Sequence, residues 1–417
     1  MDSIIKTLHG DLVSGKVSCL EMVQEKLSLL SASTCHSVNL LLEEDALACA
    51  KQVDEKIKSG KTIGALEGIP FGIMDTILLQ NNIATGGSDF LKQYNSPFTA
   101  TAIQKLIDAG AIPLVKESCD SFGHGYANGG AVNVAKGYTA FSIGGGSGVS
   151  LLQSAGKHKI YGLKPTYGKI SRCGLMANTS STDSITPLAS SLEDIRILIN
   201  TMSGKDPKDP TTYASTIIPE AVFNSGYKEI AAGYYNNFVD NEYLDDAIKN
   251  EFQKMLDALP AKGITVKPLD FFDVNLLAVV YDVLSMAETA SNLARFDGSV
   301  YGASDKDSYM TVRAENFSEE TKRRIIGGSL VSSRGYEDVY LKAGELRNAI
   351  VDRFKEDFND VDIILSPVSS KDGWPSVSPW LPALSVPFFT QNGIQIAANK
   401  NQEDNILYFA NVLKDSQ

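Results

Sequence analysis

The stretch that decides the fold is Tyr161-Gly-Leu-Lys-Pro-Thr-Tyr-Gly-Lys-Ile-Ser-Arg-Cys-Gly-Leu175, which follows the glycine-rich run Gly144-Gly-Gly-Ser-Gly-Val-Ser150. A phosphate-binding loop needs a lysine after its last glycine, because backbone N–H groups hold the phosphate oxygens while the lysine supplies positive charge. The run has no such lysine, and the nearest look-alike, Ser59-Gly-Lys-Thr62, has Glu55 in place of the first glycine. Nucleotide binding is therefore disfavoured. Taken alone, the run is typical of a flexible turn or the start of a helix.

Composition limits the classes of protein that fit. The 417 residues suffice for one large α/β domain or two ordinary ones. A net charge of -12 argues against a broad electrostatic grip on nucleic acid, although a local basic patch stays possible. The five cysteines are scattered without C-x-x-C spacing, which fits a reducing compartment and neither a disulfide framework nor a zinc site.

No targeting or membrane segment is evident at the sequence level. The N-terminus mixes Asp2, Lys6, Asp11 and Lys16 in an amphipathic pattern, so we expect a helix of the mature fold rather than a signal or transit peptide. No apolar run approaches the length that crosses a bilayer. We therefore expect a cytoplasmic protein, or a mitochondrial one if the source is eukaryotic.

Helical and extended patterns alternate along the chain, which favours a sheet covered by helices. Residues 99–110 predict a capped helix that ends at Gly110 and leads into the apolar strand 111–115. The other predicted helices are 2–30, 43–59, 191–203, 242–260, 337–358 and 403–414, and the other predicted strands are 68–74, 228–234, 263–269 and 361–366. With no linker or repeat, the pattern indicates a single domain, 1–417, with a possible subdomain at about 205–345.

The segment 161–175, together with the glycine-rich run, resembles the amidase signature family, and within it the branch of glutamyl-tRNA(Gln) amidotransferase A subunits. The resemblance extends from the N-terminus through Asn401. It implies an α/β fold in which helices flank both faces of a central mixed β-sheet. It also implies that no metal ion and no organic cofactor takes part.

The family's hydrolytic apparatus consists of a nucleophilic serine, a relay serine in a cis peptide and a lysine base, because a serine hydroxyl is a weak nucleophile without a base. Ser150 keeps the nucleophile position, but Met74 stands where the lysine belongs and Tyr126 falls on the relay serine. Methionine matches lysine in length and has no basic nitrogen. By resemblance, the loop that stabilises the oxyanion would be Ser147, Gly148 and Val149. Val149 replaces a glycine there, and its β-branched side chain restricts the backbone.

A few other residues could substitute for the missing groups. His124 precedes the lost relay position, and histidine is the commonest general base, but a structural role in a loop is the favoured alternative. Tyr126 could donate a hydrogen bond to an oxyanion, although filling the vacated space is favoured. Lys116 and Lys164 match structural lysines of the family and are expected in exposed or paired positions.

The substrate side is also altered. Residues 281–302, beginning at Tyr281, resemble the segment that lines the glutamine pocket, but Asp282 replaces a tyrosine. Arg323 or Arg324 would hold a substrate carboxylate through paired hydrogen bonds, with a salt bridge on a helix surface as the alternative. The family's acidic segment before Leu381-Pro-Ala-Leu-Ser-Val-Pro387 is missing, and with it the aspartate expected to bind the substrate's amino group.

Two classes of function follow. The favoured one is a non-hydrolytic relative that acts as a binding or scaffolding subunit of an amidotransferase-like assembly, since both proton-transfer groups are replaced. The resemblance implies that B and C subunits are the partners of this chain, and that a partner rather than this chain contacts tRNA. It implies no association with a membrane. The alternative is an active A subunit or amidase that releases ammonia from glutamine or another amide through Ser150.

Overall fold

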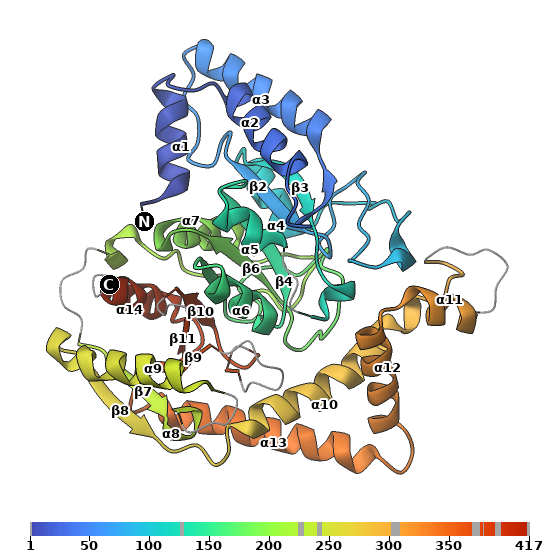
Figure 1. Cartoon of the computed structure of the whole chain (residues 1–417), viewed down its shortest axis with the longest axis vertical. Helices are drawn as coiled ribbons and strands as arrows, with labels where there is room; N and C mark the ends of the chain where they lie inside the picture. Colours follow the sequence, from blue (N-terminus) through green and yellow to red (C-terminus); the bar gives the residue numbers. More distant parts are fainter. Residues whose placement is uncertain are drawn as a thin grey trace.

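The computed structural model describes residues 2–125, 129–223, 229–239, 244–301, 309–368, 376, 377, 379–387 and 393–414. The strands within these residues are β1 (Val38–Leu41), β2 (Pro70–Met74), β3 (Ile112–Glu117), β4 (Phe141–Gly146), β5 (Tyr161–Lys164), β6 (Ser184–Ala189), β7 (Ala231–Tyr235), β8 (Thr265–Leu269), β9 (Ile363–Pro367), β10 (Ala383–Val386) and β11 (Ile394–Ala398). They form one 11-stranded sheet in the order β1-β3-β2-β4-β6-β5-β10-β11-β9-β7-β8 (Figure 1).

The sheet is mixed, as the family resemblance implies. β2 runs parallel to β3 and β4, while β6, β5, β10, β11 and β9 pair with one another in antiparallel register. All five residues of β2 are buried, which agrees with its continuous apolar sequence. The decisive stretch begins with β5, which pairs with β6 on one side and with β10 on the other. β5 therefore lies at the centre of the sheet, between strands from the N-terminal half of the chain and strands from the C-terminal half.

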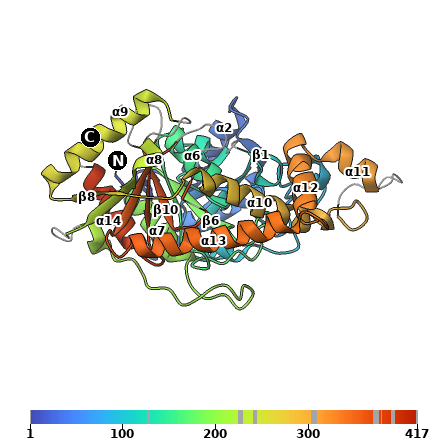
Figure 2. The same cartoon turned by 90° about the horizontal axis from the view of Figure 1, so that it is seen from below.

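The helices within the described residues surround this sheet. They are α1 (Ile4–Val13), α2 (Cys19–Ser31), α3 (Glu43–Lys58), α4 (Thr101–Asp108), α5 (Gly129–Ala135), α6 (Val149–Lys157), α7 (Leu192–Met202), α8 (Asn236–Val239), α9 (Asp246–Ala258), α10 (Asn275–Asn292), α11 (Tyr309–Asn316), α12 (Glu319–Val331), α13 (Glu337–Asp357) and α14 (Glu403–Lys414). The helices α10, α12 and α13 pack on one another beside the sheet (Figures 1 and 2).

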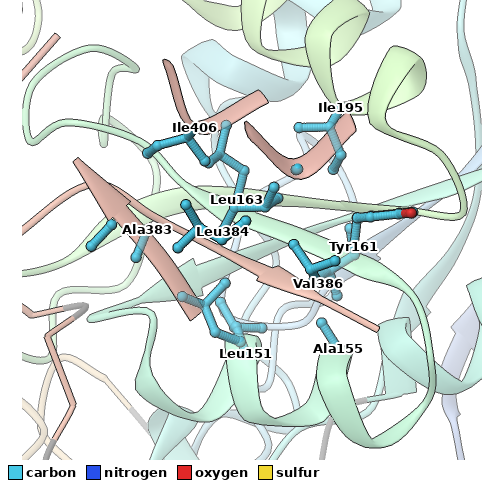
Figure 3. Close-up of a cluster of buried hydrophobic side chains, with 14 of the residues drawn as sticks. Leu151, Ala155, Tyr161, Leu163, Ile195, Ala383, Leu384, Val386 and Ile406 are labelled. Carbon is cyan, nitrogen blue, oxygen red and sulfur yellow. The ribbon is translucent and has the colours of Figure 1, made fainter. Parts of the chain in front are cut away.

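Helices cover both faces of the central strands. Figure 3 shows Ile195 of α7 and Ile406 of α14 on one side of β5 and β10, and Leu151 of α6 on the other. All three side chains are almost completely buried and belong to one continuous apolar core. Burying apolar surface on both faces of a sheet is the dominant favourable contribution to the free energy of folding.

The periodicity predicted most elements correctly. The helices predicted at 43–59, 191–203, 242–260, 337–358 and 403–414, and the strands predicted at 68–74, 111–115, 228–234, 263–269 and 361–366, are confirmed to within a few residues among those described. The domain boundaries stay a prediction, and β7 and β8 from the possible subdomain lie at one edge of the common sheet.

Two predictions near helix ends were wrong. The helix predicted at 2–30 is two helices, because Gly15 adopts a positive φ of 70° and Ser18 begins α2 with a capping box to Glu21. The helix predicted at 99–110 has no side-chain cap, since Ala100 precedes its first residue. Its end is confirmed, because Gly110 has a φ of 89° that favours glycine.

Across the described ranges, none of the helices is both long enough and apolar enough to cross a membrane.

Candidate functional site

A pocket of about 910 Å³ unites residues that the sequence predicted to lie together. Its wall includes Ser147, Val149 and Ser150 from the glycine-rich run and its helix. Tyr281 of α10, and Arg323 and Arg324 of α12, line the same pocket. The predicted nucleophile position and the predicted substrate side therefore face one cavity.

The glycine-rich run bends sharply at Gly148, the residue that precedes α6. Its φ is 90°, in the region that favours glycine, and a Cβ there would lie 2.7 Å from Cδ of Lys164. The turn places Ser150 in the first turn of α6, where unpaired backbone N–H groups of a helix favour negative charge. Among the described residues, no basic side chain hydrogen-bonds Ser150.

Met74 ends β2 beside this loop. Its side chain is 6% exposed, and its Sδ accepts a hydrogen bond from the backbone N–H of Gly145 at 3.4 Å. A thioether sulfur is a weak acceptor and cannot take up a proton near neutral pH. The second altered position, Tyr126, lies outside the described residues.

His124 lines the pocket but is engaged elsewhere. Its Nε2 lies 2.7 Å from Oδ1 of Asn178, which also accepts a hydrogen bond from the Thr289 hydroxyl, and its Nδ1 lies 3.2 Å from Oγ1 of Thr321. Because Oδ1 of Asn178 can only accept, we assign the imidazole proton to Nε2. Burial, followed by the positive charge of Arg324, lowers the pKa of His124 to about 4. His124 is therefore a neutral structural residue at pH 7, which favours the alternative that the sequence left open.

This arrangement predicts a pH effect on stability. The pKa of His124 is lower in the folded chain than its ordinary value of 6.5, so its contribution is present above pH 6.5 and is lost as pH falls through 4. Between pH 7 and pH 4, we expect the free energy of unfolding to fall by about 3 kcal/mol more in the wild type than in His124→Gln. Urea titrations at both pH values would measure this difference, and equal losses in the two proteins would contradict it.

The predicted carboxylate-binding arginines form an ion-pair cluster on α12. Glu320 accepts hydrogen bonds from Nε and Nη2 of Arg323 at 2.7 Å, and from Nε of Arg324 at 2.7 Å. Arg323 is more than half exposed, whereas the Arg324 side chain is 17% exposed and donates from Nη1 to Oγ of Ser285 on α10 at 3.3 Å. Both arginines thus form salt bridges on the helix and also line the pocket. The side chain of Arg324 is the less exposed of the two.

Tyr281 connects α10 to the glycine-rich run. Its hydroxyl donates a hydrogen bond to Oγ of Ser147 at 2.8 Å. Burial raises the pKa of the Tyr281 phenol, so it remains a neutral donor at pH 7. This bond couples the predicted substrate side to the predicted oxyanion loop.

The two matched lysines are more deeply buried than the sequence suggested. Lys116 is inaccessible to solvent and lies 3.6 Å from Oδ1 of Asp75, and burial lowers its pKa. Lys164 is 2% exposed, its Nζ lies 3.5 Å from the carbonyl oxygen of Leu381, and burial lowers its pKa to about 8. For Lys116 the expectation of an exposed or paired position is confirmed by its pairing with Asp75. For Lys164, which is buried and makes no ion pair among the described residues, the expectation was wrong.

Sequence reasoning missed Asp183, a buried carboxylate in the pocket wall. Its Oδ2 accepts hydrogen bonds from the backbone N–H groups of Asn178 and Thr179 at 2.9 Å, while burial raises its pKa to about 6. It directly precedes β6, where Ser184 pairs with Gly146. No local pattern marks it, since its place beside the glycine-rich run depends on this pairing.

In the described part of the chain, no group of three or more histidine, cysteine, aspartate or glutamate residues could hold a metal ion. The site contains a cavity, backbone N–H donors at the start of α6, two arginines and carboxylates. It can bind a polar molecule, and its serine has no base within hydrogen-bonding distance among the described residues.

The mixed sheet carries a glycine-rich turn that leads into α6, and Ser150 in the first turn of α6 lines the pocket. The family model described as Amidase matches residues 20–128 and 125–378. The chain therefore belongs to the amidase signature family.

Within this family, the chain is similar to A subunits of glutamyl-tRNA(Gln) amidotransferases. The A subunit of a glutamyl-tRNA(Gln) amidotransferase from Pelodictyon phaeoclathratiforme is 34% identical over 402 residues, covering 88% of this chain and 84% of the relative. Its counterpart from Acaryochloris marina is 32% identical and covers 99% of this chain and 97% of the relative. The chain is thus similar to these A subunits over nearly their whole length.

Solved structures confirm the fold. One, described as a vestigial protein complex that reveals the origins of an s-triazine catabolic enzyme, aligns with a TM-score of 0.85 at 21% identity, covering 100% of this chain and 98% of that one. A bacterial aryl acylamidase of the amidase signature family aligns with a TM-score of 0.84 at 15% identity, covering 98% and 95%. At these identities the similarity concerns the fold alone.

Proposed function

We propose that this chain is a non-hydrolytic relative of the amidotransferase A subunit that acts as a binding or scaffolding subunit. The observation that supports this most strongly is the hydrogen bond from Gly145 N–H to Sδ of Met74. By resemblance, Met74 stands where the family has its base, and a thioether sulfur cannot accept a proton from Ser150. His124, the nearest candidate substitute in sequence, has both ring nitrogens bonded to other residues.

The retained pocket supports a binding role. It has a volume of about 910 Å³ and keeps Tyr281, Arg323 and Arg324 in its wall. A cavity of this size with a few polar groups is typical of small-molecule sites. Since the relatives are named as A subunits, the proposed partners are B and C subunits, and assembly with them would place the chain in the cytoplasm, or in mitochondria if eukaryotic.

The alternative is an enzyme that releases ammonia through Ser150. It is favoured by one observation, the place of Ser150 in the pocket wall at the start of α6. A serine there would still need a base to remove its proton. For this reason the non-hydrolytic function is preferred.

Restoring the family's lysine tests the explanation of why the chain lacks hydrolysis. We expect Met74→Lys alone to leave ammonia release at background, because the relay serine is absent at Tyr126 and Val149 still restricts the loop. Release would be measured from glutamine, asparagine and simple aliphatic amides. Met176→Lys, which adds a lysine elsewhere in the pocket wall, is the matched control.

Turnover in Met74→Lys well above that of Met176→Lys would overturn this explanation of the site. It would mean that the missing base is the only defect and that the proton relay is dispensable.

A further inference from the structure

Large apolar side chains are exposed where α12 meets α13, and we call this surface, residues 326–342, the α12–α13 tip. Figure 1 shows the turn between the two helices away from the strands of the sheet. All eleven residues from 332 to 342 are exposed. The large apolar residues of the tip are between 39% and 69% exposed, and they are Ile326, Leu330, Tyr336, Val339, Tyr340 and Leu341. A cluster of this kind indicates an interaction surface.

The backbone of the tip is held by its own hydrogen bonds. The N–H of Ser333 donates to the carbonyl oxygen of Leu330 at 3.0 Å, and the N–H of Tyr336 donates to that of Ser333 at 3.1 Å. Gly335 turns the chain with a φ of 94°, and its N–H donates to the carboxylate of Glu337. The tip is therefore already ordered, so docking on it costs less conformational entropy than ordering a loop.

The apolar surface is large enough to hold two proteins together. Ile326 and Leu330 are one turn apart on α12, on the side opposite Gly328, which packs against Met286 of α10. Half-exposed side chains of this size present roughly 100 Å² each. The six apolar residues together thus supply more than half of the roughly 800 Å² that each partner buries in a stable interface.

The charge of the tip favours a second copy of the same chain as its partner. The whole chain has a net charge of -12, but the tip has two bases, Arg334 and Lys342, and two acids, Glu337 and Asp338. The tip is therefore neutral. A second copy meets no excess of like charge there, and an anionic membrane meets no excess of basic residues.

Two of these four charges have no partner within their own chain. Lys342 pairs with Glu345 at 2.9 Å, and Glu337 accepts the hydrogen bond in the turn. Arg334 and Asp338 form no ion pair with any other residue that the structure describes. In a two-fold symmetric interface, a contact from one residue to another is repeated in the reverse direction. One contact between Arg334 and Asp338 would therefore give two ion pairs.

We propose that this chain forms a two-fold symmetric dimer through the α12–α13 tip, in which Arg334 of each copy pairs with Asp338 of the other. The apolar side chains of the two tips pack against each other beside these ion pairs. None of the tip residues lines the pocket. The inference is therefore independent of whether the chain hydrolyses amides.

Sedimentation equilibrium of the purified full chain, without B and C subunits, tests the dimer. As concentration rises, we expect the mass of the wild type to approach twice the 45.0 kDa of one chain. Arg334→Asp and Asp338→Arg should each raise the dissociation constant about tenfold or more, because each variant places two like-charge contacts in the interface. Circular dichroism would confirm that each variant is folded.

An equimolar mixture of these two variants tests the symmetry of the contact. In the mixed dimer, one ion pair is native and the other has its charges exchanged, so we expect association close to that of the wild type. The double variant should also dimerise. Asp352→Arg is the matched control, since Asp352 is an exposed acid about 21 Å further along α13, and it should leave the dimer intact.

Three results would overturn the proposal: a wild type that stays at 45.0 kDa at every concentration, single variants that dimerise as the wild type does, or a mixture that fails to associate. A monomeric chain might instead use the tip for another partner. Binding of phosphatidylserine–phosphatidylcholine vesicles, or of co-expressed B and C subunits, that is lost in Asp338→Arg would assign the tip to that partner. Ammonia release would contradict only the non-hydrolytic function.

Discussion

Glu403→Ala is expected to lower the free energy of unfolding by roughly 3 to 5 kcal/mol, because it removes one partner of a buried ion pair. Glu403 is completely buried in the first turn of α14, and its Oε2 lies 2.6 Å from Nζ of Lys169. Its Oε1 accepts the backbone N–H of Thr166 at 2.8 Å. The substitution leaves both the lysine charge and this N–H without their partner.

A double substitution separates the effect of losing the ion pair from the effect of losing packing contacts. Removing both charges in Glu403→Ala with Lys169→Met should restore part of the loss, since the uncompensated buried charge disappears. Urea denaturation of the single and double variants measures the difference. A double variant that is less stable than Glu403→Ala would contradict this explanation. Disruption of the exposed pair Lys342–Glu345 on α13 serves as the control, with little expected effect.

Gly72→Ala is the second substitution with a large expected effect. Gly72 lies in the interior of β2, and a Cβ there would lie 1.9 Å from Oε1 of Glu117. Glu117 is fully buried, accepts hydrogen bonds from Asn133 at 3.1 Å and from Ser142, and burial raises its pKa to about 7. The added methyl group would displace this carboxyl from both donors. We expect a loss of roughly 3 kcal/mol.

Thermal or urea unfolding measures this loss, with Gly344→Ala as the matched control. Gly344 lies within α13, and a Cβ there meets no atom within 4 Å. Because alanine is the better helix former, the control should stabilise the chain by roughly 0.5 to 1 kcal/mol. A change below about 1 kcal/mol in Gly72→Ala would mean that Glu117 relocates without cost.

Local patterns in the sequence accounted for the helices and strands because each is a property of consecutive residues. Thus α13 follows from the periodicity of 337–358, and the family follows from the segment 161–175. The break after Val13 was missed because the apolar positions continue through it, while Gly15 and the Ser18 cap decide the geometry.

Only part of the site could be predicted, because local patterns describe only consecutive residues. The nearness of Ser147, Val149 and Ser150 follows from the glycine-rich run itself, and their common pocket with Arg324 followed only from resemblance. The partners of His124 lie on other loops and helices, and the place of Asp183 depends on the pairing of β4 with β6. Such contacts join segments far apart in the chain, so no local pattern encodes them.

The absence of hydrolysis is the central claim, and ammonia release by the purified wild-type chain tests it most directly. The assay would use glutamine, asparagine and simple aliphatic amides, with and without co-expressed B and C subunits, against Ser150→Ala. We predict no release above that of Ser150→Ala under any condition, from a chain that is folded and binds its partners. Release that disappears in Ser150→Ala would contradict the claim and establish a serine amidase with a different base.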